Sequence, residues 1–354
     1  MTTFTFLFPG DFMGSSTQSM KKLAEYTGYS IASVSRALDP RRSHLVKEST
    51  RRKIKEAVKT LNFSVNLSAR RLKIQRTEVI SVALLRTPFE GKCFSHEFAS
   101  NAQSSDDIQR LGEAARQYGY DLKLEFFDED TPLPEQFFDL NRTDGIIFCA
   151  YCGEEYAKLL AQSGIPAVFM SRYIDISRRD RPFVGIDRSR GFRQAVAELT
   201  AAGMKNIGWV GIPRTSYSRN SRILEELLNR ENLYCEENFH DVQDYYQLRQ
   251  VVDDLARMDA VFCGNDVIAS WVVRELRARK IEREPLIIGY DNDPSFHSQS
   301  EFDTIGHAGN PLPELAVKML DGIIRQKDNW QGNKFQVVDS EYIKRRNINH
   351  GGQK

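Results

Sequence analysis

The chain of 354 residues is too long for one small core, so two or three domains are expected. Its composition, 41% hydrophobic and 27% charged, is that of an ordinary soluble protein, and no apolar run approaches the roughly 20 residues that a membrane-spanning helix needs. The opening segment MTTFTFLFPGDFMGSSTQ lacks the basic start of a secretory signal. These features exclude a membrane protein and predict a cytoplasmic one.

The net charge of +1 conceals an uneven distribution along the chain. Residues 20–76 carry 15 Lys and Arg against 4 Asp and Glu, a balance of +11, while the remainder carries 34 against 44, a balance of −10. A folded segment this basic is typical of proteins that bind a polyanion. A solvated charged face is the alternative interpretation of the same excess.

The first predicted helix covers residues 20–27, where Met20, Leu23, Ala24 and Thr27 recur at the spacing of one helical face. Gly28 ends this helix. The next residues predict a second helix, because Ser30 can cap it by accepting a backbone N–H from its first turn. Its apolar face would then be formed by Val34, Ala37 and Leu38.

The opposite face of this second helix presents Ile31, Ala32, Ser35 and Arg36, an unusual set for a surface that meets only water. A third helix is predicted in KESTRRKIKEAVKTLNF, where apolar residues again recur at helical spacing. Two short helices joined by a tight turn, with a third behind them, are typical of a helix-turn-helix module, whose second helix enters the major groove of DNA.

From residue 78 onward, strand-like and helix-like stretches alternate. The apolar runs VISVALL, DLKLEFF, DGIIFCA and IPAVFMS are separated by helical stretches, and the rhythm resumes with NIGWVG, DAVFCG and PLIIGYD. Such alternation predicts parallel sheets covered by helices, which bind ligands beyond the carboxyl ends of their strands. No phosphate-binding loop or catalytic motif follows any of these runs, so we expect no enzyme, no cofactor and no metal site.

The five cysteines, an odd number in a long chain, do not make a disulfide framework and fit a reducing compartment. Cys149 and Cys152 form a C-x-x-C pair, which would need a second Cys or His pair to bind zinc. Because Cys149 ends an apolar run and no such pair follows, we expect two buried small side chains.

Several segments resemble the lactose-repressor, or LacI/GalR, family of regulators. KLAEYTGYSIASVSRALD and TRRKIKEAVKTLNFSVNLSARRL are similar to its DNA-binding signature. FVGIDRSRGFRQAVAELTAAGMKNIGWVG, DAVFCGNDVIASWVVRELRARKI and PLIIGYDND are similar to later family segments, so the resemblance runs from Met20 to about Asn347. It implies an all-α helix-turn-helix DNA-binding domain and an α/β effector domain of two lobes, similar to periplasmic binding proteins.

The resemblance also implies a domain plan. We expect an N-terminal extension at 1–19, the DNA-binding domain at 20–65, a hinge helix and linker at 66–77, the effector-binding and dimerisation domain at 78–347 and a tail at 348–354. The two lobes would be joined by three chain crossings, which we place near Asp187, Phe302 and Trp330.

The resemblance implies DNA-contacting residues in two segments. On the second helix it implies base-reading roles for Ile31, Ala32 and Arg36, and phosphate contacts for Ser30, Ser33 and Ser35. In NLSARRLK it implies a hinge helix that contacts DNA through Asn66, Ala69, Arg70 and Leu72, with Leu72 wedged between base pairs. Val65 departs from the family, which usually has proline before the hinge Asn.

Effector contacts are implied at several strand ends. Asn265 and Asp291 match family residues that hydrogen-bond the effector, Asp266 follows Asn265, and Tyr245 falls near an aromatic position that stacks on a sugar ring. The family arginine precedes a glycine that TSYSRNSRILEELL lacks, which leaves the candidates Arg219, Arg222 and Arg172. The structural alternatives are a helix cap at 265–266, a turn at Asp291 and core packing at Tyr245.

The sequence thus predicts a DNA-binding transcriptional regulator, more specifically a repressor, that acts as a homodimer and binds operator DNA under the control of a small effector, expected to be a sugar. Two alternatives stay open at this point. A sugar-binding transport protein would share the lobes, but the basic module argues against it. A sugar-active enzyme could use carboxylates at the strand ends, and turnover of a bound ligand would reveal it.

Overall fold

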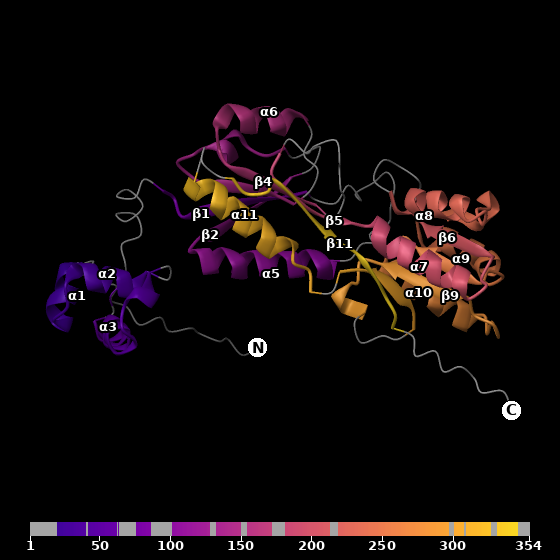
Figure 1. Ribbon diagram of the computed structural model, residues 1–354, viewed down its shortest axis with the longest axis horizontal. Coiled ribbons are helices and arrows are strands. Elements are labelled where there is room, and N and C mark those ends of the chain that lie inside the picture. The colour runs from indigo at the N-terminus through magenta and orange to yellow at the C-terminus, as the bar shows by residue number, and fades with distance from the viewer. Residues whose placement is uncertain are drawn as a thin grey trace, which may run out of the picture. The chain divides into compact units, whose positions relative to one another are not determined.

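The computed structural model describes residues 20–39, 42–61, 63, 76–85, 101–127, 132–149, 154–171, 181–212, 219–296, 301–307, 309–326 and 331–345 (Figure 1). The chain separates into two compact units: Met1–Glu78 with Gln117–Gly119, and Val79–Arg116 with Tyr120–Lys354.

The described residues of the first unit form three helices, at the positions that the sequence predicts. They are α1 (Met20–Thr27), α2 (Ile31–Leu38) and α3 (Glu48–Thr60), with a short 3-10 turn at Ser43–Leu45. Gly28 joins α1 to α2 with a φ of 71°, a conformation that glycine adopts without strain. The three helices bury one apolar cluster, formed by Leu23, Ala24, Val34, Ala37, Ile54, Ala57 and Phe63.

The second unit holds two six-stranded sheets, and each sheet with its helices is called a lobe here. The first lobe has the strand order β11-β5-β4-β3-β1-β2, all parallel. Its strands are β1 (Val79–Leu85), β2 (Asp121–Phe127), β3 (Gly145–Phe148), β4 (Ala167–Ser171), β5 (Phe183–Asp187) and β11 (Phe335–Asp339). Its helices are α5 (Asn101–Tyr118), α6 (Glu154–Ser163) and α11 (Leu312–Gln326), with a 3-10 turn at Glu135–Phe138.

Helices cover both faces of the first sheet. On one face α5 and α11 lie together, since Tyr120, just after α5, donates a hydrogen bond to Asp321 at 2.9 Å and Arg110 donates one to Glu314 at 3.4 Å. On the other face α6 packs over an apolar cluster that contains Phe137, Phe148 and Leu160.

The second lobe has the strand order β12-β10-β9-β8-β6-β7, parallel except for the antiparallel pair β10–β12. Its strands are β6 (Ile207–Gly211), β7 (Phe239–Asp241), β8 (Ala260–Cys263), β9 (Leu286–Tyr290), β10 (Asp303–Gly306) and β12 (Glu341–Ile343). Its helices are α7 (Ser189–Ala201), α8 (Arg219–Arg230), α9 (Tyr245–Leu255) and α10 (Asp266–Ala278), with 3-10 turns at Glu236–Asn238 and Pro294–Phe296.

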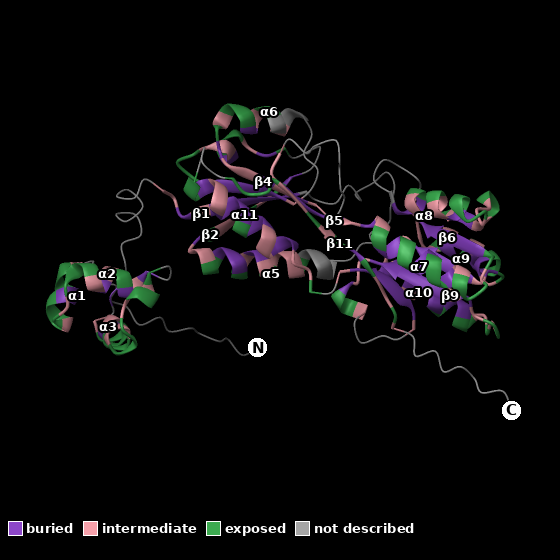
Figure 2. Ribbon diagram, in the orientation of Figure 1, coloured by how far each residue is buried: buried purple, intermediate pink, exposed green. Residues whose placement is uncertain are grey.

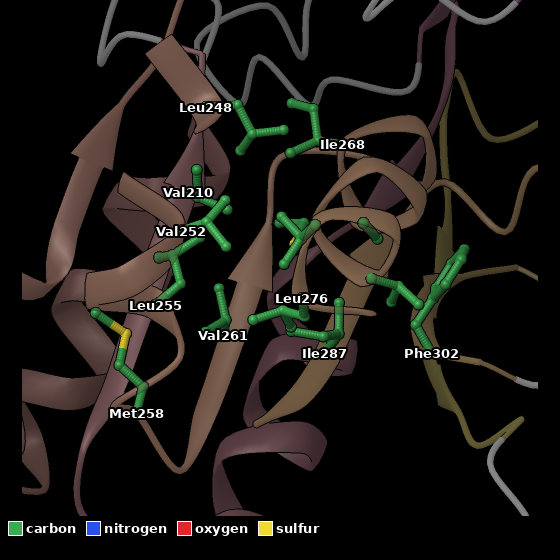
Figure 3. Close-up of a cluster of buried hydrophobic side chains, with 14 of the residues drawn as sticks. Val210, Leu248, Val252, Leu255, Met258, Val261, Ile268, Leu276, Ile287 and Phe302 are labelled. Atoms are coloured by element: carbon green, nitrogen blue, oxygen red, sulfur yellow. The ribbon is translucent and has the colours of Figure 1, made fainter. Parts of the chain in front are cut away.

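Two apolar layers enclose the second sheet. α9 and α10 cover one face through Leu248, Val252 and Ile268, which pack on Val210 and Val261 of the strands (Figure 3). α7 and α8 cover the other face through an aromatic cluster around Trp209. Figure 2 shows the central strands of this lobe buried and the exposed residues gathered on the outer sides of its helices. This packing fixes the carboxyl ends of β8 and β9 in place.

The predicted alternation of strands and helices is confirmed, although five strands have no counterpart among the predicted runs. β1 and β2 match the predicted runs end to end, and β3, β4, β6, β8 and β9 lie within theirs. The missed strands are β5, β7, β10, β11 and β12. Length alone does not explain the misses, because β3 and β8 have only four residues and were predicted; the missed β7 and β12 have three residues, and β10 and β11 mix polar with apolar residues.

Among the described residues, the chain crosses between the lobes at three points. The first follows Asp187, as predicted. The second follows Gly306, close to the predicted position near Phe302, because the residues after Phe302 first form β10 within the second sheet. The third lies at Ser340, between β11 and β12; Trp330, where we expected it, lies outside the described residues and before β11.

The first and third crossings are bonded to each other. The backbone N–H of Ser340 donates to the Asp187 carbonyl at 2.9 Å, and the Ser340 hydroxyl donates to the Arg188 carbonyl at 2.9 Å. The same hydroxyl accepts the backbone N–H of Gly191 at 3.0 Å, in the first turn of α7. Ser340 is fully buried, so this single side chain joins two crossing strands to the start of a helix.

Candidate functional site

The first candidate surface is the exposed face of α2. Val34 and Ala37 are buried in the three-helix core, which turns Ile31, Ala32 and Arg36 outward. Ile31 is 50% exposed. The structure therefore brings these three predicted residues together on one open face, with the half-buried Ser35 beside them.

The N-terminus of α2 is fixed by its cap. The Ser30 hydroxyl accepts the backbone N–H of Ser33 at 3.2 Å and lies 3.0 Å from the Ser33 hydroxyl. Ser30 is thus the N-cap that the sequence predicts, and its cap leaves other first-turn N–H groups open to a phosphate. The other four predicted DNA-contacting residues, Asn66, Ala69, Arg70 and Leu72, lie outside the described residues, as does Val65.

The second candidate surface is the carboxyl edge of the sheet in the second lobe. Asn265 follows β8 and caps α10, since its Oδ1 accepts the backbone N–H of Ile268 at 2.8 Å. Asp291 follows β9, the neighbouring strand, and is half-buried. The structure therefore brings Asn265 and Asp291 to adjacent strand ends, where parallel sheets bind ligands.

Asp291 has a strained backbone. Its φ is 103° and that of Asn292 is 50°, so two successive residues with side chains adopt left-handed conformations. Gly306 on β10 allows this turn, because a Cβ there would lie 2.5 Å from the Asn292 Cβ and 2.9 Å from its backbone nitrogen. Strain of this kind persists where surrounding contacts impose it, and it is concentrated at functional sites.

Asp266 has a different environment from its two neighbours at the edge. It is 1% exposed, and its carboxylate accepts hydrogen bonds from the Thr304 hydroxyl at 2.5 Å and the Asp293 backbone N–H at 2.8 Å. Burial raises the pKa of Asp266 from its usual 3.8 to about 7, partly opposed by these bonds and by Arg345. All these partners are protein groups of its own lobe. A contact between Asp266 and an effector therefore stays a prediction.

Tyr245 points toward α10. Its hydroxyl donates to the Glu275 carboxylate, and its ring centre lies 4.6 Å from that of Trp271. The hydrogen bond to Glu275 raises the pKa of the Tyr245 phenol. These contacts give Tyr245 a packing role between α9 and α10, while stacking on a ligand stays untested.

The arginine candidates are placed only in part. Arg222 is exposed on the first turn of α8, whereas Arg172 lies outside the described residues and nothing is described of the Arg219 side chain. Arg188, which follows Asp187 at a strand end, is a further buried arginine: it is 5% exposed, donates to Asn220 Oδ1 at 2.7 Å and lies 4.9 Å over the Tyr290 ring.

The remaining expectations concern cysteines, metals and membranes. Cys149 is half-buried, which corrects the expectation of a buried side chain, because it lies at the end of β3 where the covering layers stop; Cys152 lies outside the described residues. Within the described ranges no cluster of three or more His, Cys, Asp or Glu side chains could hold a metal ion. None of the helices described is long and apolar enough to cross a membrane.

Comparison with curated proteins finds relatives over most of the chain. It is 24% identical to the HTH-type transcriptional regulator RegA of Clostridium saccharobutylicum, covering 92% of this chain and 98% of that one. It is 26% identical to the HTH-type transcriptional repressor PurR of Photorhabdus laumondii (88% and 92%) and 25% identical to catabolite control protein A of Streptococcus mutans (95% and 96%). No protein-family model matches.

Solved structures give the same result for the fold. The lac repressor dimer bound to operator and the anti-inducer ONPF aligns with a TM-score of 0.64 at 19% identity, covering 93% of this chain and 98% of that one. The CelR–cellobiose complex aligns with a TM-score of 0.61 at 17% identity, covering 92% and 98%. The curated relatives are named as transcriptional regulators, which disfavours both the enzyme and the transport protein.

Proposed function

We propose that the chain is a DNA-binding transcriptional regulator of the LacI type, that it reads operator DNA with α2, and that a small effector at the carboxyl edge of the second lobe controls its operator affinity. Relatives of this kind include a named repressor, and we assign repression to this chain as well. Since its target is DNA, we place the protein in the cytoplasm.

The single observation that carries the DNA-binding half is the open face of α2. Ile31, Ala32 and Arg36 project from a helix whose other side is locked by Val34 and Ala37, so the unit presents them as a rigid set. An apolar side chain of this size can contact a thymine methyl group, and an arginine can donate to guanine. Lys and Arg elsewhere in this basic segment would supply the phosphate contacts.

The effector half rests on the adjacent ends of β8 and β9. The Asp291 carboxylate can accept hydrogen bonds from two neighbouring hydroxyl groups, and Asn265 can offer its amide from the next strand. Arg222, exposed at the start of α8, supplies a planar donor. Such a set suits a polyhydroxylated ligand, and the structure of CelR is a complex with cellobiose. We therefore propose a sugar or sugar derivative.

We further propose that the regulator acts as a homodimer, like the operator-bound lac repressor. β2 is an edge strand of the first lobe, and two large apolar side chains on the same side of it are open to solvent: Leu124 is 37% exposed and Phe126 is 47% exposed. An exposed apolar edge strand is an interaction surface. In the dimer, NLSARRLK would form the hinge over the minor groove, with Leu72 as the wedge.

The proposed function is tested in two steps. A thermal-shift screen of sugars and sugar phosphates should find a ligand that raises the melting temperature, because binding stabilises the folded state by mass action. That ligand should change the operator affinity of the wild type but not of Asp291→Ala, which should still bind operator. A normal response of Asp291→Ala would show that the effector binds elsewhere, and turnover of the ligand would restore the enzyme hypothesis.

A further inference from the structure

The end of the described chain closes on the turn that carries Asp291. Arg345 follows β12, and its side chain is only 8% exposed. Its guanidinium donates to Asn292 Oδ1 at 2.7 Å and to the Phe296 carbonyl at 3.1 Å. Its backbone N–H donates to Asp303 at 2.8 Å. Arg345 therefore bonds both ends of the 292–296 segment and anchors itself to β10.

Asp266 holds the same turn from the side of α10. Its carboxylate accepts the backbone N–H of Asp293 at 2.8 Å and the Thr304 hydroxyl at 2.5 Å. That hydroxyl in turn accepts the backbone N–H of Asn292 at 3.3 Å. Asp266 also lies 3.7 Å from the Arg345 guanidinium, which makes a buried ion pair. Two backbone N–H groups of the strained turn thus depend on this network.

We propose that Arg345 and Asp266 are positioning residues for the effector-binding face, an inference that rests on the function proposed above: they hold the left-handed turn that aims Asp291. Neither residue needs to touch the ligand. Arg345 lies 54 positions after Asp291 in the chain, so no local pattern in the sequence links them.

The charges around Asp266 make its ionisation sensitive to the site. The ionisable groups near it are Cys263 on β8, Asp291 and Asp293 after β9 and Arg345 after β12. Burial raises the pKa of Asp266, the Asp291 charge raises it further, and Arg345 lowers it. Because burial is the largest of these effects, the closed turn favours protonated Asp266, and loss of the proton should loosen the turn.

Effector binding is then linked to this proton. A ligand whose hydroxyl groups donate to Asp291 offsets the repulsion between the two carboxylates, which favours ionised Asp266. By reciprocity, ionised Asp266 favours the ligand. The predicted ligand affinity at this edge is thus higher above neutral pH than below it.

Hydrogen exchange on the full-length, ligand-free chain tests the positioning role. Arg345→Met should reduce the protection of the Asn292 and Asp293 amides about tenfold or more, because bonds to a charged partner are lost. Arg345→Lys should restore part of that protection, since it keeps the charge near Asp266 but cannot serve Asn292 and Phe296 together. Arg283→Met, which removes an exposed ion pair with Asp259 in the same lobe, is the matched control and should change nothing at the turn.

The pH dependence separates positioning from general stability. Wild-type protection at Asn292 and Asp293, corrected for intrinsic exchange, should fall as the pH is raised through about 7, because opening of the turn hydrates the buried carboxylate. This fall should disappear in Asp266→Asn and move to lower pH in Asp291→Asn, because the Asp291 charge is gone. Unchanged protection in Arg345→Met and Arg345→Lys, or a pH profile that is the same in all variants, would overturn the proposal. If Arg345→Met fails to fold, Arg345→Lys alone tests the positioning role. Since no ligand is used, the result does not depend on whether the proposed effector binds.

Discussion

Adjacent residues at the carboxyl edge of the second lobe have different environments, and burial makes the difference. Asn265 and Asp266 are neighbours in the chain, yet Asn265 caps α10 at the open edge while Asp266 is 1% exposed beneath it. The sequence predicts both at a strand end but cannot assign their directions, because these depend on Thr304 and Asp293, which arrive from later segments. Two interpretations of Asp291 were left open, an effector contact and a turn residue. The structure places Asp291 in a left-handed turn, which is compatible with both.

At this scale, the pH dependence of stability is a direct test of Asp266. Its pKa in the folded chain is about 7, against 3.8 when unfolded, so between these values the folded state holds a proton that the unfolded state has released. Its contribution to the free energy of unfolding is therefore fully present below pH 4 and is lost as the pH rises through 7, by about 4 kcal/mol in total.

Asp266→Asn should remove this component. Urea unfolding curves at several pH values between 5 and 8 would then show a smaller fall in stability with rising pH than the wild type shows. An equal slope in both proteins would mean that Asp266 titrates near its usual pKa and is not desolvated as the structure has it.

At the scale of elements, the sequence predicts a helix or strand correctly where neighbouring residues determine its ends. α1 and α2 were predicted within their bounds because Gly28 and Ser30 mark their ends, and β1 and β2 because long apolar runs mark theirs. The missed strands β10, β11 and β12 are short and depend on partners from distant segments, as Ser340 depends on Asp187. The third lobe crossing, expected near Trp330 and found at Ser340, was misplaced for the same reason.

The cap of α2 provides the test at this scale. Ser30→Ala should destabilise the first unit by about 1 kcal/mol, because the Ser33 N–H loses its acceptor. We expect a lower melting temperature in the transition of that unit, followed by circular dichroism, with the transition of the second unit unchanged. Thr60→Ala, which removes a hydroxyl bonded to its own helix in α3, is the control and should have a smaller effect. Equal effects would argue against a special role of the cap.

At the scale of the whole molecule, the account requires two copies, because a two-fold operator is read by a two-fold protein. Replacing Leu124 and Phe126 by Asp should therefore convert the dimer to a monomer, since buried carboxylates at an apolar interface are costly. Sedimentation equilibrium would measure the change, and operator affinity should fall with it. Leu140→Asp, an equally exposed apolar position on a turn of the same lobe, should leave the dimer intact. A dimer that survives the double substitution would place the interface elsewhere.

The central claim, that α2 reads the base sequence of an operator, is tested most directly by selecting preferred sites from random DNA with the wild type and an Ile31→Thr variant. Ile31 is half exposed on the face that α2 presents, so its replacement should change the preferred base at one position in each half-site, with a difference of about 1–3 kcal/mol between the two bases. Leu45→Ala, at another exposed apolar residue of the same unit, should keep the wild-type preference. An unchanged preferred site with Ile31→Thr would contradict the assignment of α2 as the helix that reads DNA.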